Sequence, residues 1–516
     1  MGDNDPLRSP REHTVIELAR ILDAQTFIHV RGTPASGKTT LARLLEAFYR
    51  KKNVPVIAFY SWSLTAGQSY KQVLMQEARE RGYTQFDRQF LQDGSYVLII
   101  DEGQLTYQDE AFWIEMIKMQ SRRHWGPRIC MFTCYGSPTE GSESINIAGS
   151  PLAHLGPEQR VSITVSHIEY SPSIALFYDA TEFFDVVVRF CVQSHRIPEL
   201  RLDSTAQRYI FELTHGHPGA VDAMLQMLWT FYHSALKHQG LIITDEHIIQ
   251  SLDNEEKAFQ LLMSENIRRS FPRRGKVTTE AVEILRKTLS DGSVTKDLAN
   301  PGVKQCYENG WLHSEPKDFD GDEILCVFPT RLHAKFVEYY WTSNKLDFPI
   351  WRFPDIGCLA REVLAQFSPR NISSAIRMGY AAMARPFEAS YQDEFYRASH
   401  QVLGYAMNVT SEWSSGGRGR IDFRFAQIGW GVELIREGDR LKEHCSRFAP
   451  GGTYAPWIST GLLTQWLIID CRTSWPKPLN PPEPKLWRAV FSEDFGSVQI
   501  LDSSNSPIGA PIPLMS

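Results

Sequence analysis

Short apolar runs alternate with segments of helical periodicity along the N-terminal part of the chain. Residues 26–30, 54–59 and 96–100 are rich in β-branched and aliphatic side chains and have the length of buried strands. Between them, residues 41–48 and 70–81 place apolar side chains at helical spacing. Strands that alternate with helices in this way predict an α/β region built on a parallel sheet.

The middle of the chain has a mainly helical pattern. Residues 203–213 and 220–231 are periodic helices, and the Gly- and Pro-containing turn 214–219 ends one and begins the next. Residues 255–345 contain short helices followed by a strand at 324–328. Helices followed by a hairpin are typical of a winged helix. We therefore expect a helical lid and a winged-helix-like unit.

Strands return in the last part of the chain. The proline-containing segment 348–354 is the predicted linker to a further domain. Residues 417–425 and 429–436 then form two adjacent predicted strands, and residues 439–448 form a helix behind them. The pattern predicts a second α/β domain.

A glycine-rich loop joins the first predicted strand to the first predicted helix. It fits G-x-x-x-x-G-K-[ST], and the predicted nucleotide-binding residues are Gly32, Thr33, Pro34, Ala35, Ser36, Gly37, Lys38, Thr39 and Thr40. The backbone N–H groups of such a loop surround phosphate oxygens, and its glycines permit the backbone angles that this requires. We expect Lys38 to reach the β- and γ-phosphates of ATP and Thr39 to hold Mg²⁺.

Two acids end the third predicted strand. Asp101 is expected to hold Mg²⁺ beside the phosphate loop, and Glu102 to polarise the water that attacks ATP. The loop and the acid pair together predict a P-loop NTPase that binds and hydrolyses ATP.

Other polar residues in this half have two interpretations each. Thr133 or Ser137, on the strand that begins at residue 128, is a candidate sensor of the γ-phosphate. Arg122 and Arg123 either act as an arginine finger towards a neighbouring subunit or lie exposed at a helix end. His217, in the turn of the predicted lid, either senses the nucleotide or satisfies local backbone groups.

Composition limits the partners of the chain. Its 516 residues carry a net charge of −6, so a nucleic-acid contact requires a local basic patch. One cluster between residues 268 and 276 (Arg268, Arg269, Arg273, Arg274 and Lys276) either binds phosphates or is a solvated face. The eight cysteines have no C-x-x-C pairs, which favours reduced thiols and an intracellular protein. No signal-peptide pattern or membrane-spanning run is present in the sequence.

A second pair of acids lies on the two adjacent strands of the last domain. Asp422 and Glu433 can reach one edge of a sheet, where carboxylates suit Mg²⁺ or Mn²⁺. A metal held in this way assists phosphodiester cleavage. Lys442, on the following helix, is expected to orient the water or stabilise the transition state. The alternative is that both acids form surface ion pairs with nearby arginines.

The phrase G-R-I-D-F, followed by W-G-V-E-L-I-R-E-G-D-R-L-K-E-H, resembles the nuclease domain of Crinkler effectors. The phosphate-loop half and the segment G-W-L-H resemble the ATPase and winged-helix regions joined to that domain in Crinkler and RHS-type proteins. The resemblance implies a restriction-endonuclease-like fold of the PD-(D/E)xK superfamily, regulated by a STAND-like ATPase, in effectors that act in host cells and often in the nucleus. It also implies that Glu394 is a metal-binding acid, together with Asp422 and Glu433.

The sequence departs from that family at one chemically important position. Ile435 stands where the D/E-x-K pattern has lysine, so the cation is expected to come from Lys442, with Arg436 and Arg440 as substitutes. If none of them points inward, the domain binds DNA without cutting it.

These observations predict an α/β multidomain protein. The predicted units are a P-loop NTPase core (1–170), a helical lid (171–254), a winged-helix-like domain (255–347) and a restriction-endonuclease-like domain (348–516). The expected function is an ATP-hydrolysing switch coupled to a metal-dependent DNA nuclease. The partners would be ATP or ADP, DNA and, in a homo-oligomer, other copies of the chain; the location would be the cytoplasm or the nucleus, including a host nucleus. The alternatives are a non-cutting, DNA-binding STAND-like ATPase and an oligomeric remodelling ATPase that uses the last domain as an adaptor.

Overall fold

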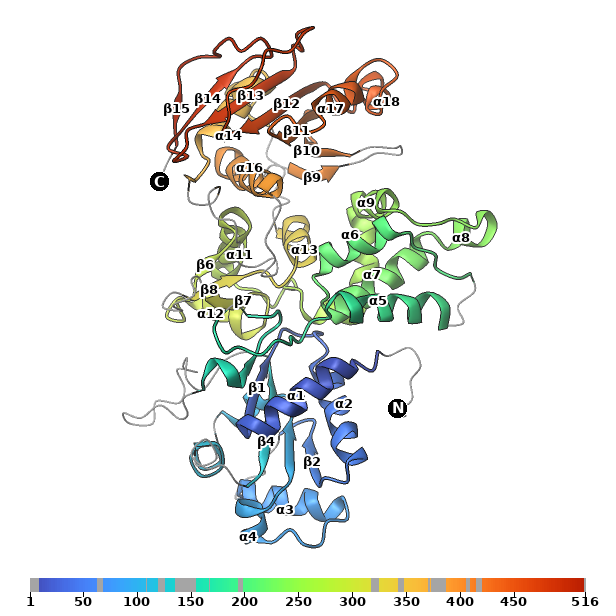
Figure 1. Cartoon of the computed structure of the whole chain (residues 1–516), viewed down its shortest axis with the longest axis vertical. Helices are drawn as coiled ribbons and strands as arrows, with labels where there is room; N and C mark the ends of the chain where they lie inside the picture. Colours follow the sequence, from blue (N-terminus) through green and yellow to red (C-terminus); the bar gives the residue numbers. More distant parts are fainter. Residues whose placement is uncertain are drawn as a thin grey trace.

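The computed structural model describes residues 9–62, 68–107, 109–118, 126–134, 155–166, 168–193, 198–316, 324–341, 348–369, 372, 387–404, 409–413 and 420–514. Three layers follow one another along the long axis of the molecule (Figure 1). The N-terminal sheet region forms one end, a mainly helical layer lies in the middle, and the C-terminal sheet region forms the other end.

The N-terminal region is a five-stranded parallel sheet with helices on both faces. Its strands, in the order in which they pair, are β2 (Val56–Phe59), β3 (Val97–Ile100), β4 (Arg128–Thr133), β1 (Phe27–Arg31) and β5 (Arg160–Val161). The helices are α1 (Glu12–Gln25), α2 (Lys38–Lys51), α3 (Tyr70–Glu80) and α4 (Arg88–Asp93). Strand β4 lies between the strand before the phosphate loop and the strand before the acid pair, so both sites meet at one sheet edge.

Two apolar cores hold this sheet. On one face, buried leucines of α1 and α2 pack against the strands, among them Leu18, Leu41 and Leu45. On the other face, α3 and the short π-helix η2 (Phe112–Lys118) contribute Leu74 and Trp113. The predicted strands and helices of this region are present, with boundaries that agree to within about three residues at each end.

The middle layer spans the residues for which a helical lid and a winged-helix-like unit are predicted, and these names are kept below for its two groups of elements. Its first group of helices is α5 (Ala180–Val188), α6 (Ser204–Thr214), α7 (Pro218–Phe231), α8 (His233–Gln239), α9 (Asp245–Asp253), α10 (Glu255–Leu262) and the 3₁₀ helix η5 (Asn266–Arg269). The second group is α11 (Thr279–Asp291), β6 (Val294–Thr295), α12 (Pro301–Glu308), β7 (His313–Pro316), β8 (Ile324–Val327) and α13 (Arg331–Trp341), with the strands forming a small antiparallel sheet in the order β6, β8, β7. One continuous apolar core runs from Phe183 to Val337 through both groups. They therefore pack as one body, which we call the cap.

The C-terminal region is a seven-stranded mixed sheet. Its strands, in pairing order, are β15 (Ile512–Pro513), β14 (Ser497–Leu501), β13 (Leu486–Phe491), β12 (Gln465–Arg472), β11 (Trp430–Arg436), β10 (Ile421–Phe425) and β9 (Val409–Trp413). Helices α14 (Ile356–Ala365) and α16 (Phe387–Leu403) cover one face, and α17 (Leu441–Phe448) and α18 (Ala455–Ser459) cover the other. Strands β9, β10 and β11 form an antiparallel meander, and β12 returns parallel to β11 after α17 and α18. The predicted strands and helix of this region are present.

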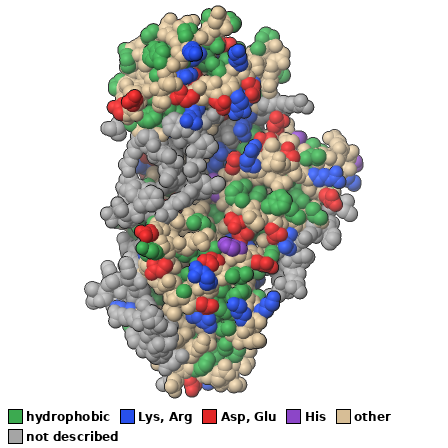
Figure 2. Space-filling model, viewed as in Figure 1, with side chains coloured by type: hydrophobic (Ala, Val, Ile, Leu, Met, Phe, Trp, Pro, Cys, Tyr) green, Lys and Arg blue, Asp and Glu red, His purple; other side chains and the backbone are tan. Residues whose placement is uncertain are grey.

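Helix α16 connects the cap to the C-terminal sheet. It packs against α11 of the cap and against β11 of the sheet. Acidic and basic side chains are interspersed on the face of the molecule in Figure 2, in line with the small net charge. Among the described residues, no helix is both long enough and apolar enough to cross a bilayer.

Candidate nucleotide site and the C-terminal acid pair

The phosphate loop lies between β1 and α2, as its pattern predicts. Gly37 is the N-cap of α2 and has φ +87°, and Ala35 has φ +62°, so the loop uses the left-handed region twice. Gly32 serves a different purpose, because a Cβ there would lie 2.0 Å from Leu176 Cδ2. The absence of a side chain at Gly32 therefore permits a close approach of two segments.

Lys38 is the buried cation of this loop. Its Nζ donates to the carbonyl oxygens of Gly32 and Thr33, each at 2.8 Å, and the residue is 6% exposed. The Ser36 hydroxyl donates to Thr33 O at 2.6 Å and ties the loop together from the other side. The ammonium group is thus held against the turn that binds phosphate in loops of this type.

The acid pair at the end of β3 lies next to the start of α2. The Thr39 hydroxyl donates to Asp101 Oδ2 at 2.5 Å, and Asp101 is buried. Burial raises the pKa of the Asp101 carboxyl, while the Thr39 hydroxyl and the Glu102 N–H partly offset this by donating to it. A hydroxyl and a carboxylate in contact are hard oxygen donors, so the residues present suit Mg²⁺.

Glu102 is oriented by a neighbour that the sequence analysis did not single out. Gln104 Nε2 donates to Glu102 Oε2 at 2.5 Å, and Gln104 Oε1 accepts from the Cys134 N–H at 3.1 Å. The amide therefore connects the acid to the end of β4. Glu102 has φ +52°, an uncommon conformation for a residue with a side chain, and such strain concentrates at functional sites.

The turn of the lid lies directly on the phosphate loop. Gly219 N donates to Ala35 O at 3.0 Å, and a Cβ on Gly219 would lie 2.7 Å from that oxygen. His217 caps α7 by accepting from Ala220 N at 3.1 Å, and its Nε2 lies 3.3 Å from Thr33 Oγ1. Burial lowers the pKa of His217 to about 3, so the ring is neutral at physiological pH.

The other residues suggested near the γ-phosphate have different positions. Thr133 is buried and its Oγ1 lies 2.8 Å from His29 Nε2, so it bonds within the sheet. Ser137, Arg122 and Arg123 lie outside the described residues.

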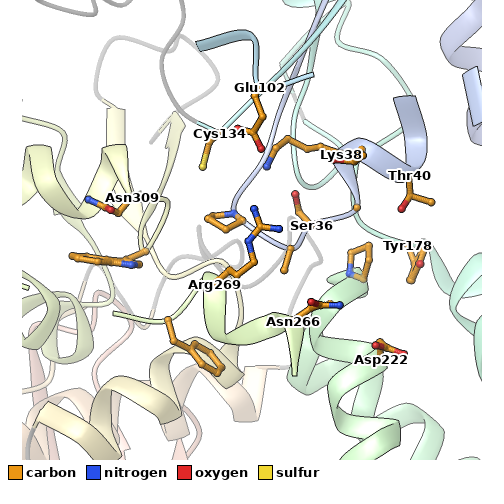
Figure 3. Close-up of a pocket in the computed structure, with 18 of the residues that line it drawn as sticks. Ser36, Lys38, Thr40, Glu102, Cys134, Tyr178, Asp222, Asn266, Arg269 and Asn309 are labelled. Atoms are coloured by element: carbon orange, nitrogen blue, oxygen red, sulfur yellow. The ribbon is translucent and has the colours of Figure 1, made fainter. Parts of the chain in front are cut away.

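The cap closes the other side of the site. A cavity of about 770 Å³ is lined by the phosphate loop, Glu102, Cys134 and residues of the cap (Figure 3). Near Thr40, the lining includes Tyr178 and Asp222. At Gly310, with φ +67°, a Cβ would lie 2.6 Å from Pro34 Cδ, so the winged unit also touches the loop.

Arg11 fixes the segment through which the chain enters the cap. Its guanidinium donates to the carbonyl oxygens of Ala175, Leu176 and Phe177, and forms an ion pair with Glu182 at 2.9 Å. Arg11 is buried and also lines the cavity. No motif in the sequence pointed to it.

In the C-terminal region, Asp422 lies near the start of β10 and Glu433 lies in the middle of β11, on neighbouring antiparallel strands. Each acid is next to the pair Phe423–Val432, and Glu433 is also paired with Ile468 of β12 on the other side of its strand. Asp422 Oδ2 accepts from Leu434 N at 2.6 Å, and Oδ1 accepts from Gln392 Nε2 of α16 at 3.1 Å.

Glu433 is 1% exposed and is held by side chains of the opposite layer. Its Oε1 lies 2.7 Å from His444 Nδ1 and accepts from Arg447 Nη1 at 2.7 Å, and Tyr454 Oη donates to Oε2 at 3.2 Å. Within the described part of the chain, no group of three or more His, Cys, Asp or Glu side chains is arranged to hold a metal ion.

The remaining predicted residues of this site lie elsewhere. Lys442 is exposed, because α17 turns His444 and Arg447 towards Glu433 and Lys442 is two positions from His444. Glu394 is fully buried in an ion pair with Arg397 at 2.6 Å, and it accepts from Ser368 N. Arg436 and Arg440 are exposed.

The strand order, the phosphate loop and the strand-end acid pair place the N-terminal region in the class of P-loop NTPase folds. No family model matches the sequence, and no curated protein matches it. Solved structures with partial similarity include the RuvB Holliday junction branch migration motor of Thermotoga maritima, at 14% identity and a TM-score of 0.32 over 60% of this chain and 94% of that chain.

A Walker-type ATPase of Pyrococcus abyssi has 12% identity and a TM-score of 0.33 over 63% of this chain and 95% of that chain. Cdc6p of Pyrobaculum aerophilum has 12% identity and a TM-score of 0.29 over 64% of this chain and 94% of that chain. At these TM-scores the similarity is too weak to support an assignment, so the class rests on the geometry of the chain itself. The resemblance to Crinkler effectors stays a prediction.

Proposed function

We propose that this protein binds and hydrolyses ATP with Mg²⁺ and that the cap changes its hold on the phosphate loop with the nucleotide state. The observation that carries the proposal is the contact of Thr39 with Asp101 beside the Lys38 ammonium, inside a cavity closed by the cap. A bound Mg²⁺ would neutralise phosphate charge, and Thr39 and Asp101 are the residues that would hold it.

Each residue of the site has a role in the proposed reaction. Lys38 would leave the loop carbonyls to bind the β- and γ-phosphates, and the loop N–H groups would bind the remaining oxygens. Glu102, fixed by Gln104, would accept a proton from the water that attacks the γ-phosphorus. The bond between that phosphorus and the bridging oxygen breaks, which leaves ADP and phosphate.

Nucleotide-dependent thermal stabilisation tests this proposal. Mg·ATP should raise the melting temperature of the wild-type protein, since a ligand that binds only the folded state stabilises it by about 2.7 kcal/mol at one hundred times its Kd. Lys38→Ala should abolish the shift, whereas Lys51→Ala, at the exposed end of the same helix, should retain it. An equal shift in the wild type and in Lys38→Ala would contradict the assignment.

A second candidate function is metal-dependent cleavage of DNA by the C-terminal region. It is favoured by the order of α16, the β9–β11 meander, α17 and the parallel strand β12, with Asp422 and Glu433 on the neighbouring strands β10 and β11. Mg²⁺ or Mn²⁺ would be the metal, and DNA the partner. The contacts of Glu433 with Arg447 and His444 favour instead the alternative, a domain that binds DNA without cutting it.

Digestion of a linear duplex distinguishes the two. If the domain is a nuclease, the wild type cuts with Mg²⁺ or Mn²⁺ and Asp422→Ala does not, while Asp439→Ala, an exposed acid beside α17, cuts normally. Salt-sensitive binding without any metal-dependent product would establish the non-cutting alternative.

A further inference from the structure

Three cations of the described part of the cap line the cavity, namely Arg269, Arg273 and Lys276, and Arg269 is directed towards the phosphate loop. Arg269 is the last residue of η5, and Figure 3 shows its guanidinium directed towards the space beside Ser36, Lys38 and Glu102. Tyr178 and Asp222 lie on the other side of that view, near Thr40. Because Glu102 is the residue expected beside the attacking water, Arg269 is oriented to the γ-phosphate end of the cavity.

The position of Arg269 is fixed by buried neighbours in the chain. Ile267 is fully buried, and the Ser270 hydroxyl donates to Ile267 O at 2.7 Å. The same hydroxyl lies 2.9 Å from His333 Nε2 of α13, so η5 is attached to the winged unit. Helix η5 also packs against α7, whose first residues touch the phosphate loop.

Electrostatics place Arg269 close to the reactive end of the site. Desolvation raises the pKa of the half-buried Cys134 thiol, and the charges of Lys38, Glu102 and Arg269 all act on it. Within the part of the chain that the structure describes, no carboxylate forms an ion pair with Arg269, although its side chain lines the cavity. Arg268 and Arg269 are both exposed, but of the two only Arg269 lines the cavity.

We propose that Arg269 binds the γ-phosphate of ATP from within the same chain and so reports the nucleotide state to the cap. This inference rests on the proposed ATPase function. A guanidinium presents its N–H groups as a planar fork that suits two phosphate oxygens, and charge builds up on those oxygens during phosphoryl transfer. ADP lacks these oxygens, so the contact would be made with ATP and lost after hydrolysis. The cap would then be attached more tightly to the loop in the ATP state.

Equilibrium binding of Mg·ATPγS and of ADP to the full-length chain tests the inference. Arg269→Ala should raise the Kd for ATPγS roughly tenfold or more and leave the Kd for ADP within about twofold. Arg269→Lys should recover only part of the affinity, because an ammonium is a point charge without the fork. Arg268→Ala, the matched control, should bind both nucleotides like the wild type.

Four other results would each overturn the inference. Equal losses for ATPγS and ADP in Arg269→Ala would mean that the arginine does not recognise the γ-phosphate. The same loss in Arg268→Ala would mean that the effect is one of general charge. Wild-type binding by Arg269→Ala, with binding lost in Lys38→Ala, would reject the inference and leave the proposed ATPase intact, whereas a wild type that binds no nucleotide would reject both. The melting temperatures of the unliganded Arg269→Ala and Arg268→Ala variants should agree, which excludes misfolding as the cause of a binding loss.

Discussion

Two strands of this protein lead into or carry acids that look alike in sequence and differ in their surroundings. Asp101 and Glu102 follow β3 at the wall of a cavity of about 770 Å³, next to a lysine and a threonine that suit a phosphate and a divalent cation. Glu433, on β11, is buried in contact with Arg447 and His444, whose nitrogen atoms already occupy the hydrogen-bonding positions around its carboxylate. An acid on or directly after a strand thus marks a binding site only where the layer that covers it leaves space.

The largest effect that tests this difference is expected at Glu102. Glu102→Gln keeps the shape of the side chain and its contact with Gln104 but removes the proton acceptor, so kcat for ATP should fall roughly 10³-fold with Mg·ATP binding unchanged. Phosphate release at saturating ATP measures this change. Glu110→Gln, an exposed acid nearby, is the control. An unchanged kcat in Glu102→Gln would remove Glu102 from the reaction.

A smaller effect, on stability, is expected in the C-terminal region. Arg447→Ala leaves the Glu433 carboxylate buried without its main cation, which should reduce the free energy of unfolding by about 3 kcal/mol. Urea unfolding of this variant and of Arg440→Ala, an exposed arginine next to α17, measures the difference. If the two variants are equally stable, Glu433 does not depend on the ion pair, and a role as a metal ligand gains support.

The smallest effect is expected at the junction between the cap and the C-terminal region. Burial raises the pKa of Glu338 on α13 to about 7, Lys335 opposes this, and Tyr396 of α16 forms a hydrogen bond with the carboxyl. Because its folded-state pKa lies above the ordinary value, Glu338 contributes most stability while protonated, and this contribution is lost as the pH rises through about 7.

Thermal unfolding between about pH 6 and about pH 8 checks the sign. The wild type should lose on the order of 1 kcal/mol relative to Glu338→Gln, which stays neutral throughout. Glu256→Gln, an exposed position on α10, should retain the pH dependence of the wild type. A wild type that becomes more stable towards pH 8 would contradict the prediction.

The elements around the candidate nucleotide site could be predicted from the sequence because the motifs that encode them are local. The phosphate loop, the strands beside it and the helix α2 are encoded by residues that are neighbours in the chain, and they lie where the pattern predicts them. Thr39 and Asp101 are 62 positions apart, but both follow strands whose parallel pairing brings them to one sheet edge. Gln104 and Arg11 were missed because their roles depend on contacts that no motif describes.

The C-terminal site shows why the same reasoning was less successful there. Strands β10 and β11 and helix α17 form as predicted, and the periodicity of that helix already indicates which of its side chains share a face. His444 and Arg447 are three positions apart and share a face, whereas Lys442 lies on another side. Which face turns towards the sheet depends on packing against Phe448 and Tyr454 and could not be deduced from a family pattern. The sequence does not decide whether the basic cluster between residues 268 and 276 binds phosphates. Only the folded structure shows that Arg269 lines the cavity and that Arg268 does not.

The hydrogen bonds from Arg11 to the carbonyl groups of residues 175–177 bear on how the cap can move relative to the sheet. In the part of the chain that the structure describes, the passage from the sheet to the cap lies between β5 and α5, and it contains the segment that Arg11 holds. Since the cap has a single core, any movement away from the loop under the proposed function would involve the cap as a whole and this passage. The hydrogen bonds of one buried guanidinium would then restrain that movement.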